Sequence, residues 1–128
     1  MIDHLSLGIS ELARSTRFYD HTLGALGYQR LSADDASLSY GSDEPKLWLL
    51  KTARPVVADP ESGLHLSFVA STPAQVDAFY RAAMDYGGSD NGGPGVRESY
   101  GSGYYAAFVV DPDGYRLEAH CELAEAAK

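Results

Sequence analysis

Hydrophobic and polar residues alternate strictly at the start of the chain. Apolar residues at positions 5, 7 and 9 alternate with His4, Ser6 and Gly8. Side chains two positions apart share one face of a strand. The pattern therefore predicts a strand over Ile2–Gly8 that has one apolar and one polar face.

The period then lengthens to that of a helix. Ser10 is the expected N-cap of this helix, and Gly24 and Gly27 are expected to end it. Three short β-like runs follow, at Tyr28–Leu31, Ser37–Tyr40 and Lys46–Lys51. The first part of the chain is thus predicted to have the order β-α-β-β-β.

The same order appears a second time. A strand at Leu64–Val69 precedes a helix that begins with a capping box, Thr72 to Gln75, and stops at Gly87-Gly88. A glycine-rich loop over residues 89–95 comes next. Three strands then complete the unit, at Val96–Ser99, Tyr104–Val110 and Tyr115–Cys121, with a turn at Asp111–Gly114 between the last two.

The two units are copies of each other at an offset of 61 residues. His4-Leu5-Ser6-Leu7 aligns with His65-Leu66-Ser67-Phe68 under this offset. An internal duplication decides the architecture: an α+β fold of two tandem βαβββ modules that form a curved mixed-sheet cleft with the helices on the outside. We expect one domain over residues 1–122, with modules at 1–54 and 62–122 and a C-terminal tail at 123–128, because units of about sixty residues are marginal alone.

Composition narrows the function classes. The chain of 128 residues carries a formal net charge of −8, which argues against nucleic acid and against an anionic membrane surface. No apolar run approaches the roughly 20 residues that span a bilayer, and the N-terminus lacks the features of a signal peptide. The single cysteine, Cys121, fits a reducing compartment. We therefore expect a cytoplasmic protein.

Two histidines at one repeat position and a carboxylate in only one half suggest a metal site. His4 and His65 begin equivalent strands, and Glu118 lies on the last strand, opposite to Leu117 and Ala119. If a pseudo-twofold axis brings the two first strands together, these three groups meet on the concave side of the sheet. Such a set suits zinc, nickel, iron, copper or manganese and leaves positions open for substrate or oxygen.

Each of these residues also has a plainer interpretation. A histidine at the start of a strand is more often a satisfied polar residue than a ligand, and a glutamate there usually faces solvent. His120 is either a second acid or base or a solvent-facing residue. Cys121, on the apolar face, is expected to be inert in the core.

An aromatic and cationic group follows the glycine-rich loop. It consists of Arg97, Tyr100, Tyr104 and Tyr105. Tyrosine offers contact area together with one polar tip. These residues either line a substrate pocket or pack the edge of the sheet.

Two parts of the chain resemble the vicinal oxygen chelate superfamily, which comprises glyoxalases, bleomycin resistance proteins and extradiol dioxygenases. Ile2–Gly8 with Ser15–Tyr19 looks like its opening strand and helix, and Asp111–Glu118 looks like its closing signature. The resemblance covers about residues 1 to 122. It implies paired modules around a cleft that holds a divalent metal, with the ligands His4, His65 and Glu118.

The chain departs from glyoxalase I of this superfamily at Trp48, where that enzyme has a fourth ligand, a glutamate. Tryptophan cannot bind a metal, so the resemblance implies a three-ligand set and not lactoylglutathione chemistry. It implies a glyoxalase-like metalloenzyme (a lyase, transferase or dioxygenase) that binds two oxygens of a small substrate through zinc, nickel, manganese or iron. Glu118 would also be the catalytic residue, and Trp48 would form a wall of the pocket that faces Arg97.

A protein of a different class also fits the resemblance. It is a metal-free, bleomycin-resistance-like binding protein that sequesters a small aromatic ligand between Trp48 and the tyrosines. The intact set of His4, His65 and Glu118 favours the enzyme, because a binder has no need of it. In either case we expect a homodimer, since pairing two copies would cover exposed strand edges.

Overall fold

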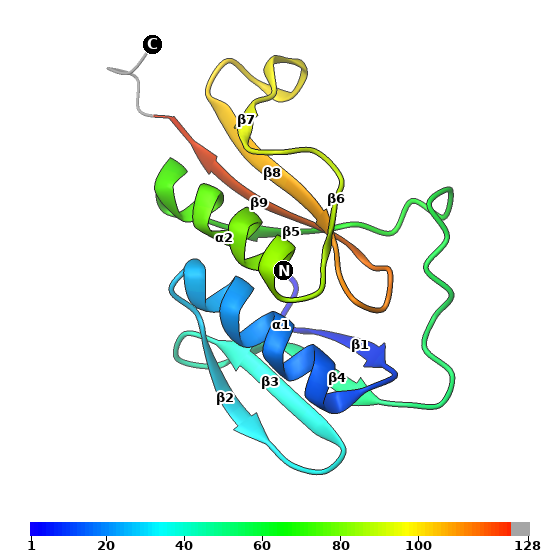
Figure 1. Ribbon diagram of the computed structural model, residues 1–128. Helices are drawn as coiled ribbons and strands as arrows, with labels where there is room; N and C mark the ends of the chain where they lie inside the picture. Colours follow the sequence, from blue (N-terminus) through cyan, green and yellow to red (C-terminus); the bar gives the residue numbers. More distant parts are fainter. Residues whose placement is uncertain (124–128) are drawn as a thin grey trace.

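The computed structural model describes residues 1–123 and contains a βαβββ unit followed by a second unit of the same order with one additional short strand (Figure 1). The first unit consists of β1 (Leu5–Ile9), α1 (Leu12–Ala25), β2 (Gln29–Ala33), β3 (Ser37–Gly41) and β4 (Pro45–Lys51). The second consists of β5 (Leu66–Val69), α2 (Pro73–Asp85), β6 (Ser89–Asp90), β7 (Gly95–Val96), the 3-10 turn η1 (Glu98–Tyr100), β8 (Tyr104–Val110) and β9 (Arg116–Glu122). Residues 124–128 of the predicted tail lie outside the described part of the chain.

Each unit forms its own mixed sheet, and the two sheets have matching strand orders. The first sheet has the order β1-β4-β3-β2, and the second has β5-β9-β8-β6, with β7 also paired to β8. In both sheets the first strand pairs in parallel with the last, and the remaining neighbours are antiparallel. The predicted α+β fold and its duplication are confirmed, with two separate sheets in place of a continuous one.

The two helices lie side by side and cover one face of each sheet (Figure 1). Their buried stripes supply most of the helical core, namely Phe18, Tyr19 and Leu23 from α1 and Val76, Phe79 and Ala83 from α2. From β9, the apolar residues Leu117, Ala119 and Cys121 are buried with them. Alternate residues of the strands therefore point to the opposite side, which we call the helix-free face of each sheet.

The two helices begin in different ways. At α2 the side chain of Thr72 accepts a hydrogen bond from the N–H of Gln75 at 3.2 Å, as the capping box predicts. At α1 the N-cap is Glu11, without a side-chain cap. The prediction of Ser10 as N-cap is wrong, because its hydroxyl donates instead to Asp113 of the other module at 2.6 Å.

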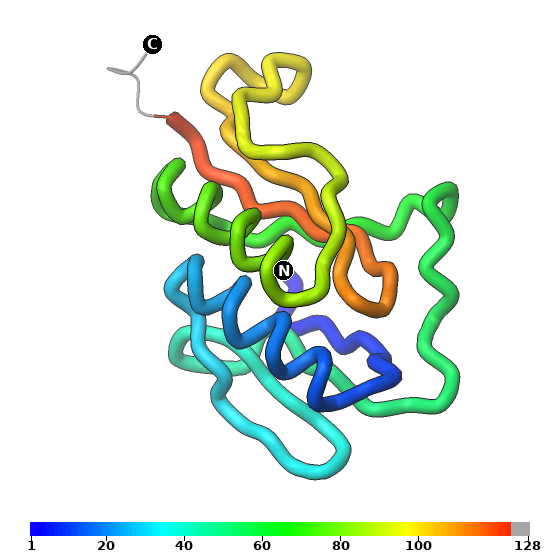
Figure 2. The backbone as a smooth tube through the Cα atoms, viewed as in Figure 1, coloured from blue at the N-terminus to red at the C-terminus, as the bar shows by residue number. Residues whose placement is uncertain are grey.

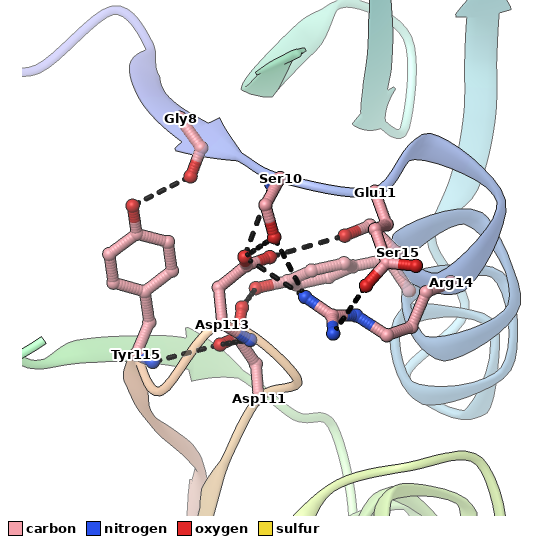
Figure 3. Close-up of polar contacts among 9 residues, drawn as sticks. Gly8, Ser10, Glu11, Arg14, Ser15, Asp111, Asp113 and Tyr115 are labelled. Atoms are coloured by element: carbon pink, nitrogen blue, oxygen red, sulfur yellow. Dashed lines mark hydrogen bonds and ion pairs between the residues drawn. The ribbon is translucent and has the colours of Figure 1, made fainter. Parts of the chain in front are cut away.

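A polar cluster joins the turn between β8 and β9 to the start of α1 (Figure 3). The carboxylate of Asp113 accepts hydrogen bonds from the backbone and hydroxyl of Ser10, at 3.1 and 2.6 Å, and from the guanidinium of Arg14 at 3.1 Å. The hydroxyl of Tyr115 donates to the carbonyl oxygen of Gly8 at 2.6 Å. The closing turn of the second module thus fixes the end of β1 and the beginning of α1.

A second carboxylate of the same turn, Asp111, is buried beneath this cluster. It accepts hydrogen bonds from the N–H groups of Asp113 and Tyr115, at 2.9 and 2.8 Å, and from the hydroxyl of Tyr19. Burial is the main cause that raises the pKa of Asp111 to about 6, and nearby Asp113 adds to it. The carboxylate is therefore costly to ionise in the folded protein.

Replacing Asp111 with asparagine is expected to remove a pH dependence of stability. The pKa of about 6 in the folded state lies above the ordinary value of 3.8, so the free energy of unfolding falls as the pH rises from below 4 to above 6. The difference amounts to at most about 3 kcal/mol. Asparagine keeps an acceptor for the two backbone N–H groups and carries no charge. Urea unfolding from pH 4 to 8 should show the decline in the wild type only, and an equal decline in the variant would contradict the assignment.

The segment between the glycine-rich loop and β8 differs from the prediction. A strand was expected at Val96–Ser99, but β7 stops at Val96 and η1 follows. The N–H of Tyr100 bonds to the carbonyl of Arg97 at 3.0 Å, which closes a tight turn in place of an extended strand. Two residues of the expected loop, Ser89–Asp90, form β6 instead.

β1 and β5 remain edge strands, and no ladder joins them in the described part of the chain. Apolar side chains are exposed on both, with Leu5 at 38% and Val69 at 69% of full exposure. The long connection from β4 to β5 runs along the outside of the two units (Figure 2). Within residues 1–123, neither helix has the length and apolar character that crossing a bilayer requires.

Candidate functional site

The structure brings His65 and Glu118 together. Glu118 lies on the central strand β9 and pairs in register with Ser67 of the edge strand β5. His65, two positions before Ser67, shares its face, and its Nε2 lies 2.8 Å from Oε1 of Glu118. The carboxylate is buried while the imidazole is 43% exposed, so the pair opens to solvent on the histidine side.

Tyr104 binds the other oxygen of the same carboxylate. Its hydroxyl donates to Oε2 of Glu118 at 2.5 Å. Partial burial and this hydrogen bond raise the pKa of Tyr104 to about 12, so the hydroxyl keeps its proton and remains a donor. The ring of His120 stacks on Tyr104 with a centroid separation of 3.7 Å. His120 thus supports Tyr104, and its Nε2 lies 3.3 Å from the carboxylate of Glu122.

Phe108 of β8 and Arg97, which follows β7, extend this face. Phe108 pairs in register with Glu118, and its ring centroid lies 5.9 Å from that of His65. The guanidinium carbon of Arg97 lies 5.3 Å from the same phenyl ring. Tyr100, in η1, is exposed and contacts Tyr104 edge-on at 5.3 Å. Four predicted residues of the second module therefore gather around Glu118, namely His65, Arg97, Tyr100 and Tyr104.

Tyr105 is placed away from this group. Its side chain points toward the helix layer, where the hydroxyl donates to Asp77 of α2 at 2.6 Å. Consecutive residues of a strand lie on opposite faces, so Tyr104 and Tyr105 cannot both line one pocket. The strand period alone would have separated them.

The first module contributes matching positions without joining the group. Trp48 pairs with Ser6 in the first sheet just as Glu118 pairs with Ser67 in the second, so Trp48 is the counterpart of the glutamate. His4 precedes β1, and its Nδ1 lies 2.7 Å from the carboxylate of Asp3. Among residues 1–123, no three His, Cys, Asp or Glu side chains are close enough together to share an ion.

A cavity of about 780 Å³ lies between the modules, at the free edge of β5. His65 and Ser67 line it together with apolar residues of both modules, among them Leu5, Tyr40 and Phe68. Neither Trp48 nor the aromatic and cationic group lines this cavity. Sequence analysis missed Ser67 and Phe108, although each shares a strand face with a residue that it did find.

The sequence and the fold of the chain are similar to those of known proteins. The model of the Glyoxalase/Bleomycin resistance protein/Dioxygenase superfamily matches residues 1–119. The chain belongs to this superfamily. The resemblance inferred from the opening and closing segments is thereby confirmed.

Individual known proteins resemble most of the chain. A glyoxalase/bleomycin resistance protein from Albidiferax ferrireducens is 31% identical, with a TM-score of 0.81 over 91% of this chain and 95% of that one. An uncharacterized protein, YqjT of Bacillus subtilis, is 29% identical over 90% of this chain and 94% of its own. The fosfomycin resistance protein FosX from Mesorhizobium loti shares the fold, at 17% identity and a TM-score of 0.67, over 99% of this chain and 98% of that one.

Proposed function

We propose that this chain is a metal-dependent enzyme that acts on a small molecule through two adjacent oxygens of its substrate. The observation that carries the proposal is the contact between Nε2 of His65 and Oε1 of Glu118 at 2.8 Å. Two ligand atoms about 2.1 Å from one ion, at right angles, lie about 3.0 Å apart. The donor set therefore fits a divalent ion such as zinc, nickel, manganese or iron with little rearrangement.

His4 is the third proposed ligand, and we assign it to the site from a second copy of the chain. Within residues 1–123 the outer edges of β1 and β5 have no strand partner, and both strands carry exposed apolar side chains. A homodimer can therefore bring β1 of one copy to β5 of the other. Because Trp48 occupies the counterpart of Glu118, the protein supplies three ligands. Exchangeable positions then remain for a bidentate oxygen ligand.

The residues of the chain would divide the work of a lyase, transferase or dioxygenase reaction. When bound, the metal supplies Lewis-acid polarisation of the substrate oxygens. Tyr104 holds one oxygen of Glu118 and so orients the other toward His65. Glu118 is the candidate proton acceptor, in the state in which its free oxygen is not a ligand.

A second candidate function is the metal-free sequestration of a small ligand. It is favoured by the cavity of about 780 Å³ and its largely apolar wall, since sites for small molecules commonly have volumes of this order. A binder of this kind would need neither His4 nor Glu118.

Metal analysis separates these two functions. The freshly purified wild-type protein is expected to hold about one divalent ion per chain, which a chelator removes and the added metal restores. His65→Ala should bind none and stay folded, because the side chain lies half exposed on the helix-free face. His21→Ala is the matched control, since His21 sits on α1. Stoichiometric binding that survives in His65→Ala, or no binding in the wild type, would refute the proposed function.

Tyr104→Phe is expected to weaken metal binding about tenfold to a hundredfold, because partners that orient a ligand typically contribute this much. The substitution removes the 2.5 Å hydrogen bond to Glu118 and keeps the ring that stacks on His120. Competition with a chromophoric chelator measures the affinity. Tyr100→Phe removes a neighbouring hydroxyl and should leave the affinity unchanged. Equal affinities of the two variants would contradict a positioning role for the Tyr104 hydroxyl.

A further inference from the structure

The guanidinium of Arg97 is held in a fixed place on the helix-free face of the second sheet. One of its nitrogens donates to the carbonyl oxygen of Gly93 at 2.6 Å. Its carbon lies 5.3 Å from the ring centroid of Phe108, within the range of a cation–π contact. A guanidinium has five N–H donors, so most of them remain available after this single hydrogen bond.

The glycine-rich loop makes room for this side chain. A Cβ at Gly92 would lie 3.2 Å from one terminal nitrogen of Arg97, and a Cβ at Gly95 would lie 3.1 Å from the other. Both distances are tighter than ordinary contacts. The backbone of the loop therefore follows the guanidinium closely, and the sequence Gly92-Gly93-Pro94-Gly95 has a local structural reason.

The charge of Arg97 is not neutralised by the protein in the described residues. Arg14 and Arg30 each lie within 4.0 Å of a carboxylate, whereas Arg97, like Arg17, Arg54, Arg81 and Arg116, is in none of the described ion pairs. Arg97 differs from these four arginines in its fixed position, because Gly93 and Phe108 both hold the guanidinium. A positioned guanidinium with free donors suits a planar or tetrahedral oxyanion, which it can bind through two parallel hydrogen bonds.

Phe108 connects this cation to the proposed metal ligands. The centroid of its ring lies 5.3 Å from the guanidinium carbon of Arg97 and 5.9 Å from the ring centroid of His65. Arg97 and His65 thus both lie next to the same aromatic ring. One small molecule can reach both.

We infer that Arg97 binds an oxyanion of the substrate, a carboxylate or phosphonate group distinct from the oxygens at His65 and Glu118. This inference rests on the proposed function, because other oxygens of the same substrate would bind at His65 and Glu118. The substrate then belongs to the class of small organic anions. The glycine-rich loop contributes to the preference for a charged substrate because it holds the guanidinium of Arg97 in place.

Calorimetric titration with charged and neutral probes of one shape tests the inference. The probes are benzoate, phenylphosphonate and the neutral benzamide, added to chelator-treated protein so that no metal contributes. Arg97→Gln removes the charge and keeps a donor for Gly93. Arg17→Gln is the control, because it changes the net charge equally, and Arg17 contacts only the face of Tyr86, at 6.0 Å, among its described aromatic and ionic contacts.

At least one oxyanion should bind the wild type and Arg17→Gln equally and bind Arg97→Gln about tenfold or more weakly, while benzamide does not distinguish them. The tighter of the two anions identifies the group as carboxylate or phosphonate, and Arg97→Lys should recover part of the affinity. The inference is overturned if neither anion binds the wild type, or if Arg97→Gln binds both as well as Arg17→Gln does. If the wild type binds metal but its affinity for anions does not depend on Arg97, only the anion site is refuted. If the affinity for anions depends on Arg97 but the wild type binds no metal, only the metal-dependent function is refuted.

Discussion

A one-to-one mixture of His4→Ala and Glu118→Ala chains, unfolded and refolded together, should recover about a quarter of the wild-type metal binding. Each variant alone should bind almost none. About half of the dimers in the mixture contain one chain of each kind. In such a dimer one site carries both substitutions, and the other is intact if His4 acts across the dimer, as proposed.

The control mixture combines His65→Ala with Glu118→Ala. Both residues belong to the same side of the site, where they lie 2.8 Å apart within one chain. Every site in the mixed dimer therefore lacks one of them, and no binding should return. If the first mixture also recovers nothing although both variants fold and form dimers, His4 does not complete the site from a second copy.

Gly88→Ala is expected to destabilise the protein by about 2 to 3 kcal/mol, whereas Gly24→Ala should stabilise it by up to about 1 kcal/mol. A Cβ at Gly88 would lie 2.8 Å from the ring of Phe18 and 2.9 Å from the carbonyl oxygen of Ala83. Neither neighbour has space to move, because both are buried between the helices. A Cβ at Gly24 would meet nothing within 4 Å, in the last turn of α1.

Chemical unfolding of the two variants measures both effects. The pair is informative because the same methyl group is added at two glycines that follow or end a helix. Opposite signs would establish that Gly88 is required by the close approach of α1 to the end of α2. A neutral effect at Gly88 would mean that Phe18 can shift at no cost.

Much of the fold could be predicted because the sequence repeats its own pattern. The alternation in β1 and β5, the helical stripes and the capping at Thr72 are local signals, and each led to the element that the structure contains. Ser10 was misassigned because its partner, Asp113, lies 103 positions away. No local pattern carries that information.

The site was predictable within one module and not between modules. The strand period correctly placed Glu118 opposite to Leu117 and Ala119, and the register of β5 with β9 brings His65 to it. The same period, applied to β8, would have excluded Tyr105 from the predicted pocket residues, because Tyr104 and Tyr105 point to opposite faces. Whether His4 joins the pair depends on how two sheets without a common ladder are arranged, and residue spacing does not encode this arrangement.

The self-contained sheets also bear on how the chain folds as it is synthesised. Every strand partner of the first sheet lies between Leu5 and Lys51, so all of these strands are synthesised before the strands of the second sheet. The first half can therefore assemble its ladders early, as N-terminal units generally do. The contacts of Asp113 and Tyr115 with Ser10 and Gly8 come from the final turn of the chain. These contacts between the modules, unlike the ladders of the first sheet, therefore form only after the closing turn of the second module has been synthesised.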